Sequence, residues 1–315
     1  MRIGFLGAGT VSWLHAAAIA ETPGMELAAV YDPRTERAEA LAVAYRAETV
    51  PASRDLTGRD HLDAVFVLTP THAHVASARE CLDAGKHVLV EKPVDEDPAA
   101  IRDLSARAER AGRVAVPGHN YLHLPECARL VRQVRDGRLG EVRALFITYT
   151  IAHPEELAAQ YEGVLAEVLV HHAYLALAIL GRPDRVYGGT SRPGWATLAT
   201  DDQAWMTWEY AGGALAQMFG SFAVDDLSDS PGTFSVKALG TKGSSAFNWR
   251  STTTAGGDGP FLVGMPLYEE TYRNQCASFR DAVRLGAAPA STLDDAAEAA
   301  EIIAALRGIA SPRGG

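Results

Sequence analysis

The chain has 315 residues, of which 47% are hydrophobic and 22% are charged. This length and apolar content predict about two globular domains, each with a core of its own. The formal net charge of -10 at pH 7 disfavours nucleic acid and anionic membranes as partners.

The cysteines and the hydropathy of the sequence narrow the class of protein further. Cys81, Cys127 and Cys276 lie far apart and show neither CxxC nor Cys/His spacing, so we expect no disulfide framework and no metal site. The sequence starts without a leader pattern and contains no run near the roughly 18 apolar residues that span a bilayer. We therefore expect a cytoplasmic protein.

The first 120 residues alternate between short apolar runs and segments of helical length, which predicts a doubly wound parallel sheet. The predicted strands are Arg2–Leu6, Glu26–Tyr31, Ala64–Leu68, His87–Val90 and Val114–Pro117. The predicted helices are Val11–Glu21, Arg34–Tyr45, His72–Ala84 and Ala99–Arg110.

After about residue 120 the pattern changes to helices and consecutive strands joined by glycine turns, which favours an antiparallel or mixed sheet. Ser251–Pro260 has the composition of a loop. We predict an α/β protein with a dinucleotide-binding domain over 1–120 and a substrate-binding α+β domain over 121–315, whose closing helices could pack back on the first domain. The predicted later elements are strands Glu141–Thr150, Asp202–Tyr210, Ala214–Phe222 and Phe234–Leu239, and helices Leu267–Leu285 and Leu293–Ile309.

The run Gly7-Ala8-Gly9-Thr10-Val11-Ser12 follows a predicted strand and opens a predicted helix, which is the setting of a dinucleotide fingerprint. Gly7 permits the tight turn, and Gly9 lets the backbone approach a pyrophosphate at the helix N-terminus. Ser12 stands where the fingerprint has a third glycine. The run therefore predicts a cofactor site that includes Ala8, Thr10 and Val11.

Asp32 lies at the end of the next predicted strand, where its carboxylate can accept hydrogen bonds from an adenosine ribose. The same carboxylate would repel a 2′-phosphate, so NAD is favoured. Arg34 and Arg37 stand near enough in sequence to neutralise a phosphate, which leaves NADP open. A second interpretation makes Asp32 a cap of the following helix, with Pro33 in its first turn.

Glu91-Lys92-Pro93 follows the predicted strand His87–Val90. The carboxyl ends of strands carry the chemistry of doubly wound sheets, and a lysine there could move a proton while a hydride is transferred. The alternative is an ordinary surface lysine in a loop.

Together these motifs resemble the Gfo/Idh/MocA family of oxidoreductases over nearly the whole chain. The matching runs are Gly7–Gly9, Thr69–His74, Ala84–Pro93, Gly118–Asn120, Gly137–Glu141 and Leu293–Ala296.

The resemblance implies that Thr69 and Pro70 line the nicotinamide side of the cofactor and that Glu91 contacts it. It also implies that Lys92 works at the reacting carbon and that the Lys92–Pro93 bond is cis. Two further cofactor-binding residues are expected, His74, for which helix capping is the alternative, and Asn120.

A second group of candidate catalytic residues lies in the predicted helical stretch Gly163–Leu180 and consists of Glu167, His171 and Tyr174. Spacings of four and three place them on one stripe of a helix. Imidazole titrates near neutral pH, so His171 suits the proton loss that accompanies alcohol oxidation. In the family, aspartates stand in place of Glu167 and Tyr174. The alternative is that the helix buries His171 or His172 as hydrogen-bonded core residues.

The resemblance implies an NAD(P)-dependent enzyme that moves a hydride between nicotinamide and a secondary alcohol or ketone of a sugar, cyclitol or related polyol. It also implies a homodimer or homotetramer. Two alternatives remain open: transient oxidation of a glycoside with no net redox change, and a regulator that senses NAD(P) without catalysis.

Overall fold

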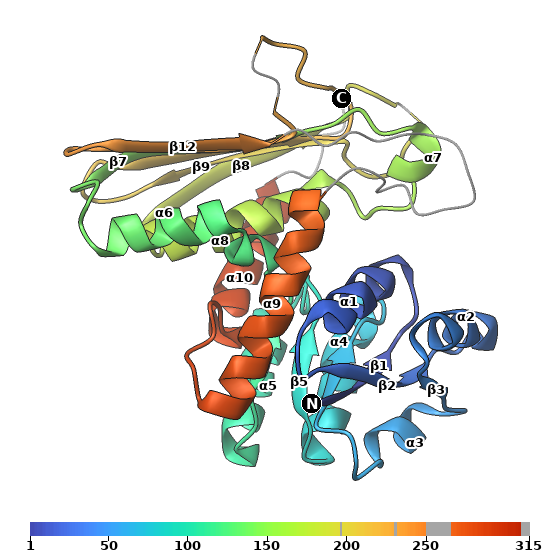
Figure 1. Ribbon diagram of the computed structural model, residues 1–315. Helices are drawn as coiled ribbons and strands as arrows, with labels where there is room; N and C mark the ends of the chain where they lie inside the picture. The colour runs from blue at the N-terminus through green and yellow to red at the C-terminus, as the bar shows by residue number, and fades with distance from the viewer. Residues whose placement is uncertain (196, 230–231, 250–265, 310–315) are drawn as a thin grey trace. The chain divides into compact units, whose positions relative to one another are not determined.

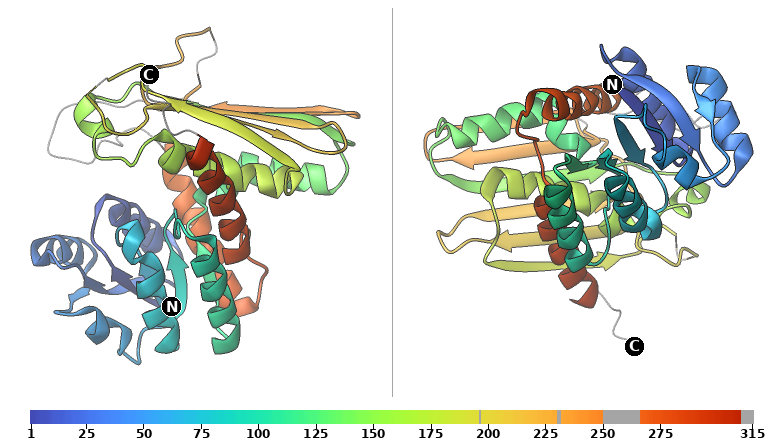
Figure 2. Two further views of the ribbon diagram at one scale, coloured as in Figure 1. Left: turned by 180° about the vertical axis from the view of Figure 1, so that it is seen from behind. Right: turned by 90° about the horizontal axis from the view of Figure 1, so that it is seen from below.

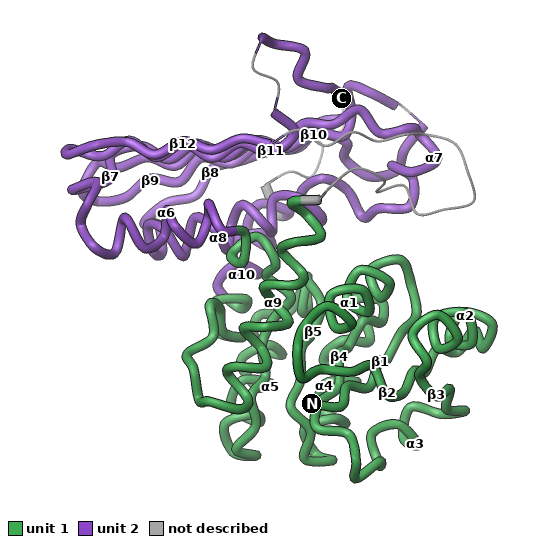
Figure 3. The backbone as a smooth tube through the Cα atoms, viewed as in Figure 1, with its two compact units in different colours: residues 1–124, 266–297 green, residues 125–265, 298–315 purple. Residues whose placement is uncertain are grey.

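The computed structural model of the chain describes residues 1–195, 197–229, 232–249 and 266–309. They form two compact units, shown in different colours in Figure 3. Unit 1 comprises residues 1–124 and 266–297, and unit 2 comprises the described residues of 125–249 and 298–309. The predicted loop Ser251–Pro260 lies outside the described residues.

Unit 1 is built on a parallel sheet with the strand order β3-β2-β1-β4-β5-β6 (Figure 1). This is the order of a Rossmann fold, which confirms the predicted fold class of the first domain. The strands are β1 (Arg2–Leu6), β2 (Glu26–Tyr31), β3 (Glu48–Thr49), β4 (Ala64–Val67), β5 (His87–Val90) and β6 (Ala115–Pro117).

Helices cover both faces of this sheet. On one face, Phe5 and Phe66 stack with ring centroids 5.7 Å apart, in a core shared with α1, α2 and α9. On the other face, Gly4 lies against Leu56 of α3. The helices of unit 1 are α1 (Thr10–Glu21), α2 (Thr35–Tyr45), α3 (Ser53–Thr57), α4 (Thr71–Asp83), α5 (Pro98–Ala111), the 3₁₀ turn η1 (Asn120–His123) and α9 (Pro266–Leu285).

Local sequence explains these elements. All four residues of β4 are fully buried, as expected of a strand with helices on both faces, and its Val and Phe side chains suit that position. Asp97 caps the start of α5, where its carboxylate accepts the Ala99 N–H, and Gly112 caps the end of the helix in the left-handed region.

Unit 2 contains a mixed sheet with the strand order β12-β11-β7-β10-β9-β8. Strands β7 and β10 are parallel, and the other neighbours are antiparallel. This confirms the predicted second sheet. The strands are β7 (Val142–Thr150), β8 (Arg185–Ser191), β9 (Gln203–Glu209), β10 (Leu215–Ser221), β11 (Phe234–Gly240) and β12 (Ser244–Trp249).

Helices α6 and α8 lie along one face of this sheet (Figures 1 and 2). The opposite face carries the exposed side chains of Phe146, Tyr187, Trp205 and Leu215. The helices of unit 2 are α6 (Pro125–Arg135), α7 (Glu155–Ala158), the π-helical segment η2 (Leu165–Leu169) and α8 (Val170–Leu180), while α10 (Leu293–Ile309) is divided between the units. Within the described ranges, no helix is both long and apolar enough to cross a membrane.

Candidate active site

The glycine turn between β1 and α1 has the geometry of an anion site. Gly7 has φ +106°, and a Cβ there would lie 2.4 Å from the Leu68 carbonyl oxygen, so only glycine fits. A Cβ on Gly9 would meet open space. Gly9 is the N-cap of α1, and this helix start has no side-chain cap and no acidic residue in its first turn. The backbone N–H groups at this helix start are therefore not blocked by a side chain, which fits the pyrophosphate of a dinucleotide.

Ser12 explains how the turn tolerates a missing third glycine. Its side chain is buried and donates a hydrogen bond of 3.0 Å to the Gly7 carbonyl oxygen. The hydroxyl therefore supports the turn where the fingerprint has glycine.

Asp32 links the end of β2 to the glycine turn. Its Oδ2 accepts the Ala8 N–H at 2.7 Å and its Oδ1 accepts the Arg34 N–H at 2.8 Å. Helix α2 starts at Thr35 with Arg34 as its N-cap, so the expectation that Asp32 caps this helix with Pro33 in the first turn is wrong. Each carboxylate oxygen keeps a second lone pair, which leaves Asp32 able to accept from a ribose hydroxyl.

The segment after β4 contributes Thr69 and Pro70, and the first turns of α4 contribute His74. Thr69 Oγ1 is buried without a partner among the described atoms, and Pro70 is exposed at the start of α4. His74 lies 2.8 Å from the Pro93 oxygen through Nδ1 and 2.6 Å from the Thr69 oxygen through Nε2. Burial lowers the pKa of His74, and the two carbonyl contacts oppose that effect. His74 therefore joins the segments after β4 and β5, and its role in cofactor binding stays a prediction.

Lys92 directly follows the buried residue Glu91 at the carboxyl end of β5. Glu91 Oε2 accepts the backbone N–H of Lys92 at 2.9 Å, and Glu91 Oε1 lies 2.8 Å from His15 Nε2. The Lys92–Pro93 peptide bond is cis, as the resemblance implied.

Helix α9 brings further polar groups to this strand end. Tyr268 interacts electrostatically with Lys92, and its hydroxyl lies 3.1 Å from that of Tyr272. Asn120, which is buried, donates to Thr271 Oγ1 at 3.0 Å. Burial raises the pKa of both tyrosines, so both phenols stay neutral near pH 7.

In unit 2, the structure places His171 beside Tyr174 on α8. His171 Nδ1 lies 2.6 Å from the Tyr174 hydroxyl, and both side chains are buried. Glu167 is half-buried and lies in the π-helical segment η2. The predicted helical stretch is thus a π-helical turn followed by an α-helix. Such π-turns are frequent at functional sites.

Asp201 fixes the start of this helical segment, and the sequence alone did not reveal it. Its carbonyl oxygen accepts the Val164 N–H at 3.1 Å, and its Oδ2 accepts the Leu165 N–H at 2.9 Å. Gly163, at φ +102°, lies so close that a Cβ would be 2.5 Å from Asp201 Oδ1. Burial raises the pKa of Asp201, and the backbone N–H bonds oppose this.

His172 differs from its neighbour His171. It is fully buried near Phe234, and neither ring nitrogen has a hydrogen-bond partner among the described residues. Burial lowers its pKa from 6.5 to about 3. His172 is therefore a neutral core residue.

This burial predicts acid sensitivity. Below pH 6.5 the unfolded chain binds a proton at His172, whereas the folded chain does so only near pH 3, so stability falls as pH drops through this window. At pH 5 the loss from His172 is about 2 kcal/mol. Urea unfolding at pH 7.5 and pH 5 measures how far the free energy of unfolding falls between the two. In His172→Phe this fall should be about 2 kcal/mol smaller than in the wild type. Equal losses in both proteins would contradict this assignment.

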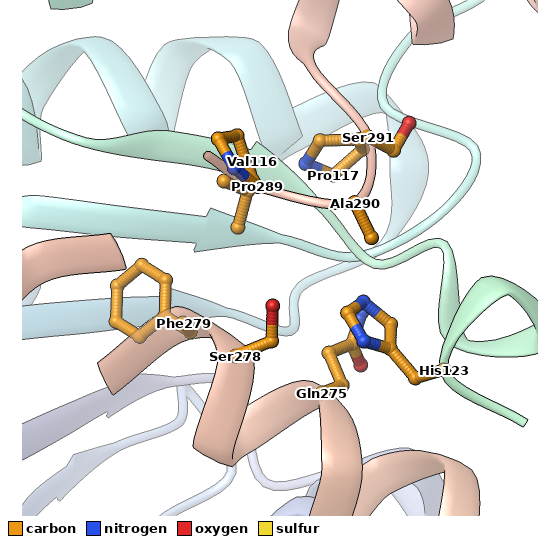
Figure 4. Close-up of a pocket in the computed structure, with 9 residues that line it drawn as sticks. All are labelled: Val116, Pro117, His123, Gln275, Ser278, Phe279, Pro289, Ala290 and Ser291. Atoms are coloured by element: carbon orange, nitrogen blue, oxygen red, sulfur yellow. The ribbon is translucent and has the colours of Figure 1, made fainter. Parts of the chain in front are cut away.

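Two hollows of unit 1 are separate from the Lys92 strand end. One, of about 410 Å³, lies at the amino ends of β4 and β5, beside Asp63, Lys86 and His87. The other, of about 10 Å³, is large enough for one water molecule. It is lined by Val116, Pro117, His123, Gln275, Ser278, Phe279, Pro289, Ala290 and Ser291 (Figure 4).

Comparison with known proteins gives two family matches. Residues 1–119 match the oxidoreductase family with an NAD-binding Rossmann fold. Residues 127–246 match the GFO/IDH/MocA C-terminal domain. The two matches belong to one family and together cover most of the chain.

Similar proteins agree with these matches. The chain is 29% identical to inositol 2-dehydrogenase of Rhizobium meliloti over 99% of its length and 98% of the relative. It is 32% identical to dTDP-3,4-didehydro-2,6-dideoxy-alpha-D-glucose 3-reductase of Streptomyces antibioticus, in a match that spans 58% of each protein. A solved structure of a putative myo-inositol dehydrogenase from Sinorhizobium meliloti superposes with TM-score 0.82 at 26% identity, covering 98% of this chain and 96% of the other. The chain therefore belongs to the GFO/IDH/MocA family of NAD-binding oxidoreductases.

Proposed function

We propose that the protein transfers a hydride between NAD and a secondary alcohol or ketone of a sugar, cyclitol or related polyol. The observation that carries this proposal is the position of Lys92. It lies at the carboxyl end of β5, in the same parallel sheet whose β1–α1 turn fits a dinucleotide pyrophosphate. Ligands of doubly wound sheets bind outside these strand ends.

The nicotinamide ring supplies the hydride acceptor, and the protein must supply the acid–base chemistry. Lys92 can take the hydroxyl proton when its amine is neutral, or it can polarise the oxygen when it is charged. The buried carboxylate of Glu91 holds the Lys92 backbone at the strand end. Thr69, whose hydroxyl is buried without a partner among the described atoms, follows the neighbouring strand β4 and is a candidate for cofactor contact.

His171 is the second proposed acid–base group. To accept a proton at Nε2, the ring must carry its hydrogen on Nδ1, and the Tyr174 oxygen 2.6 Å away can accept that hydrogen. The proposed role of Tyr174 is to accept from Nδ1–H and so to hold the tautomer that a base requires. Glu167 is proposed to orient the substrate or His171.

The similar proteins support the substrate class, since one is named for inositol and another for a deoxysugar linked to dTDP. The test is an absorbance assay at ~340 nm with a panel of cyclitols, free sugars, glycosides and nucleotide sugars, each with NAD and NADP. Reduction of NAD by a panel member supports the proposal. Conversion of a glycoside without net NADH would indicate transient oxidation instead, and binding of NAD with no turnover would indicate a sensor.

Asp32 should set the choice between NAD and NADP. Its carboxylate lies at the end of β2 beside the glycine turn, where it would repel a 2′-phosphate. We expect Asp32→Ala to lower the NAD to NADP ratio of kcat/KM by about tenfold or more, although loss of the Ala8 contact will also weaken the turn. Asp32→Asn removes the charge but keeps an oxygen that can accept the Ala8 N–H. It is therefore the matched control for the loss of that hydrogen bond. An unchanged ratio in both variants would contradict the role of Asp32.

We also propose that unit 2 forms a homodimer or homotetramer through its sheet. Phe146, Tyr187, Trp205 and Leu215 share one face of the sheet by their register, and each side chain is more than a third exposed. Exposed apolar clusters of this kind mark association surfaces. Sedimentation of the wild type and of Trp205→Glu tests the proposal, because a charge on this face should favour the monomer. A wild-type monomer at micromolar concentration would contradict it.

A further inference from the structure

His15 and Glu91 form a buried pair within unit 1. His15 lies on α1 with 0% of its surface exposed, and its Nε2 is 2.8 Å from Glu91 Oε1. A carboxylate only accepts, so His15 Nε2 carries the hydrogen and donates it. The second oxygen of Glu91 accepts the backbone N–H of Lys92 at 2.9 Å. A chain of two hydrogen bonds thus leads from α1 to Lys92.

Packing leaves Glu91 little room to move. A Cβ on Gly118 would lie 3.0 Å from Glu91 Oε1, so the residue after β6 must be small. The His15 ring is enclosed by Phe5, Phe66 and Tyr272, with its centroid 6.4, 5.4 and 4.8 Å from theirs. The carboxylate is therefore held from two sides by residues that are themselves fixed.

The charge of Glu91 depends on His15. Burial raises the pKa of Glu91, but the His15 bond and the nearby Lys92 outweigh this effect and bring the pKa below its ordinary value. Without the His15 donor, a buried carboxylate would shift toward its neutral form. Among the described residues, the titratable groups that interact electrostatically with Glu91 are His15 from α1, Lys92 after β5, His74 from α4, and Tyr268 and Tyr272 from α9.

We propose that His15 is a positioning residue for Lys92, which acts by holding Glu91 as an anion bound to the Lys92 backbone. The inference rests on the proposed function, since it gives Lys92 the proton-transfer role. The hydrogen bond of His15 goes to Glu91, whose other oxygen holds the Lys92 backbone. Its effect should therefore appear in the titration of Lys92 and in kcat, and less in the affinity for NAD.

The chain offers a clean measurement because it has only four lysines, Lys86, Lys92, Lys237 and Lys242. Reductive methylation with ¹³C-formaldehyde gives each lysine an NMR signal whose pH titration can be followed, and Lys92→Arg identifies the Lys92 signal. In His15→Phe, Glu91 loses its donor and neutralises more readily, so the Lys92 pKa should fall by about one unit. Lys237 and Lys242 should titrate as in the wild type and serve as internal references.

His15→Gln is the conservative variant, because its amide can donate to Glu91 in place of the imidazole. It should restore the wild-type titration of Lys92. His172→Phe is the matched control, since it removes a buried histidine from unit 2 and should leave Lys92 unchanged. Should His15→Phe fail to fold, Gly118→Ala perturbs Glu91 from its other side and should also shift the Lys92 titration.

Activity provides the second readout. His15→Phe should lower kcat by about 10-fold to 100-fold with little change in KM for NAD, and His15→Gln should recover most of the loss. A folded His15→Phe protein with a wild-type Lys92 titration would overturn the inference. Absence of turnover in the wild type with every substrate would instead count against the proposed function, while the Lys92 titration still decides the role of His15.

Discussion

Replacement of Lys92 by alanine is expected to lower kcat by about 10²–10⁴-fold, the usual contribution of a positioned acid or base. Affinity for NAD should change little, because the proposed pyrophosphate site consists of backbone N–H groups of the turn after β1. The loss should therefore appear in kcat, with the dissociation constant of NAD preserved. Steady-state kinetics and NAD titration by protein fluorescence measure the two quantities separately.

Two further variants sharpen this result. Lys92→Arg keeps the positive charge but cannot lose its proton near neutral pH, so it stays inactive if Lys92 is a base and recovers activity if Lys92 only polarises the oxygen. Lys242→Ala removes an exposed lysine of unit 2 and should leave kcat unchanged. Wild-type turnover by Lys92→Ala would remove Lys92 from the mechanism.

The sequence predicted the parts of the fold that depend on local patterns. Buried strands such as β4 and β5 are short apolar runs, and the glycine turn and Asp32 have fixed spacings that any dinucleotide turn requires. Strands β8 and β12 were missed because they are rich in Gly and Ser and only partly buried. Their strand character comes from pairing with β9 and β11, which no local pattern reveals.

The environment of Lys92 could be predicted only in part. The strand-end position follows from sequence, but its neighbour Tyr268 comes from a helix more than 170 residues later in the chain. The hydrogen bond between His15 and Glu91 joins residues 76 positions apart, and neither residue lies in a motif that predicts contact with the other. Such contacts are set by tertiary packing, so the spacing of residues in the sequence does not predict them. In hindsight, a lone histidine on the apolar face of the helix after the glycine turn was the available signal.

The same limit applied to the helical segment of unit 2. Spacing predicted a helix that carries Glu167 and His171, but it did not predict that Glu167 lies in a π-helical turn whose start is fixed by Asp201. Asp201 comes more than thirty residues later in the chain. The pairing of His171 with Tyr174, three residues apart, agrees with the helical spacing because it lies within the regular α-helix.

His171→Ala is expected to lower kcat by about 10²–10⁴-fold, since it removes the second proposed acid–base group. Tyr174→Phe should cause a smaller loss of kcat, because it leaves the imidazole in place and removes the oxygen proposed to accept from His171 Nδ1–H. His172→Phe, at the adjacent position of α8, is the matched control and should retain kcat near pH 7.5. A His171→Ala protein as active as this control would exclude His171 from the reaction.

The double variant Lys92→Ala/His171→Ala tests whether the two residues act on the same proton. Groups that work as a unit show strongly non-additive losses, because removal of either one already abolishes the step. We therefore expect the double variant to lose little more activity than the more impaired single variant. If the fold-losses of activity of the two single variants multiply in the double variant, Lys92 and His171 contribute independently. One of them would then not act on this proton.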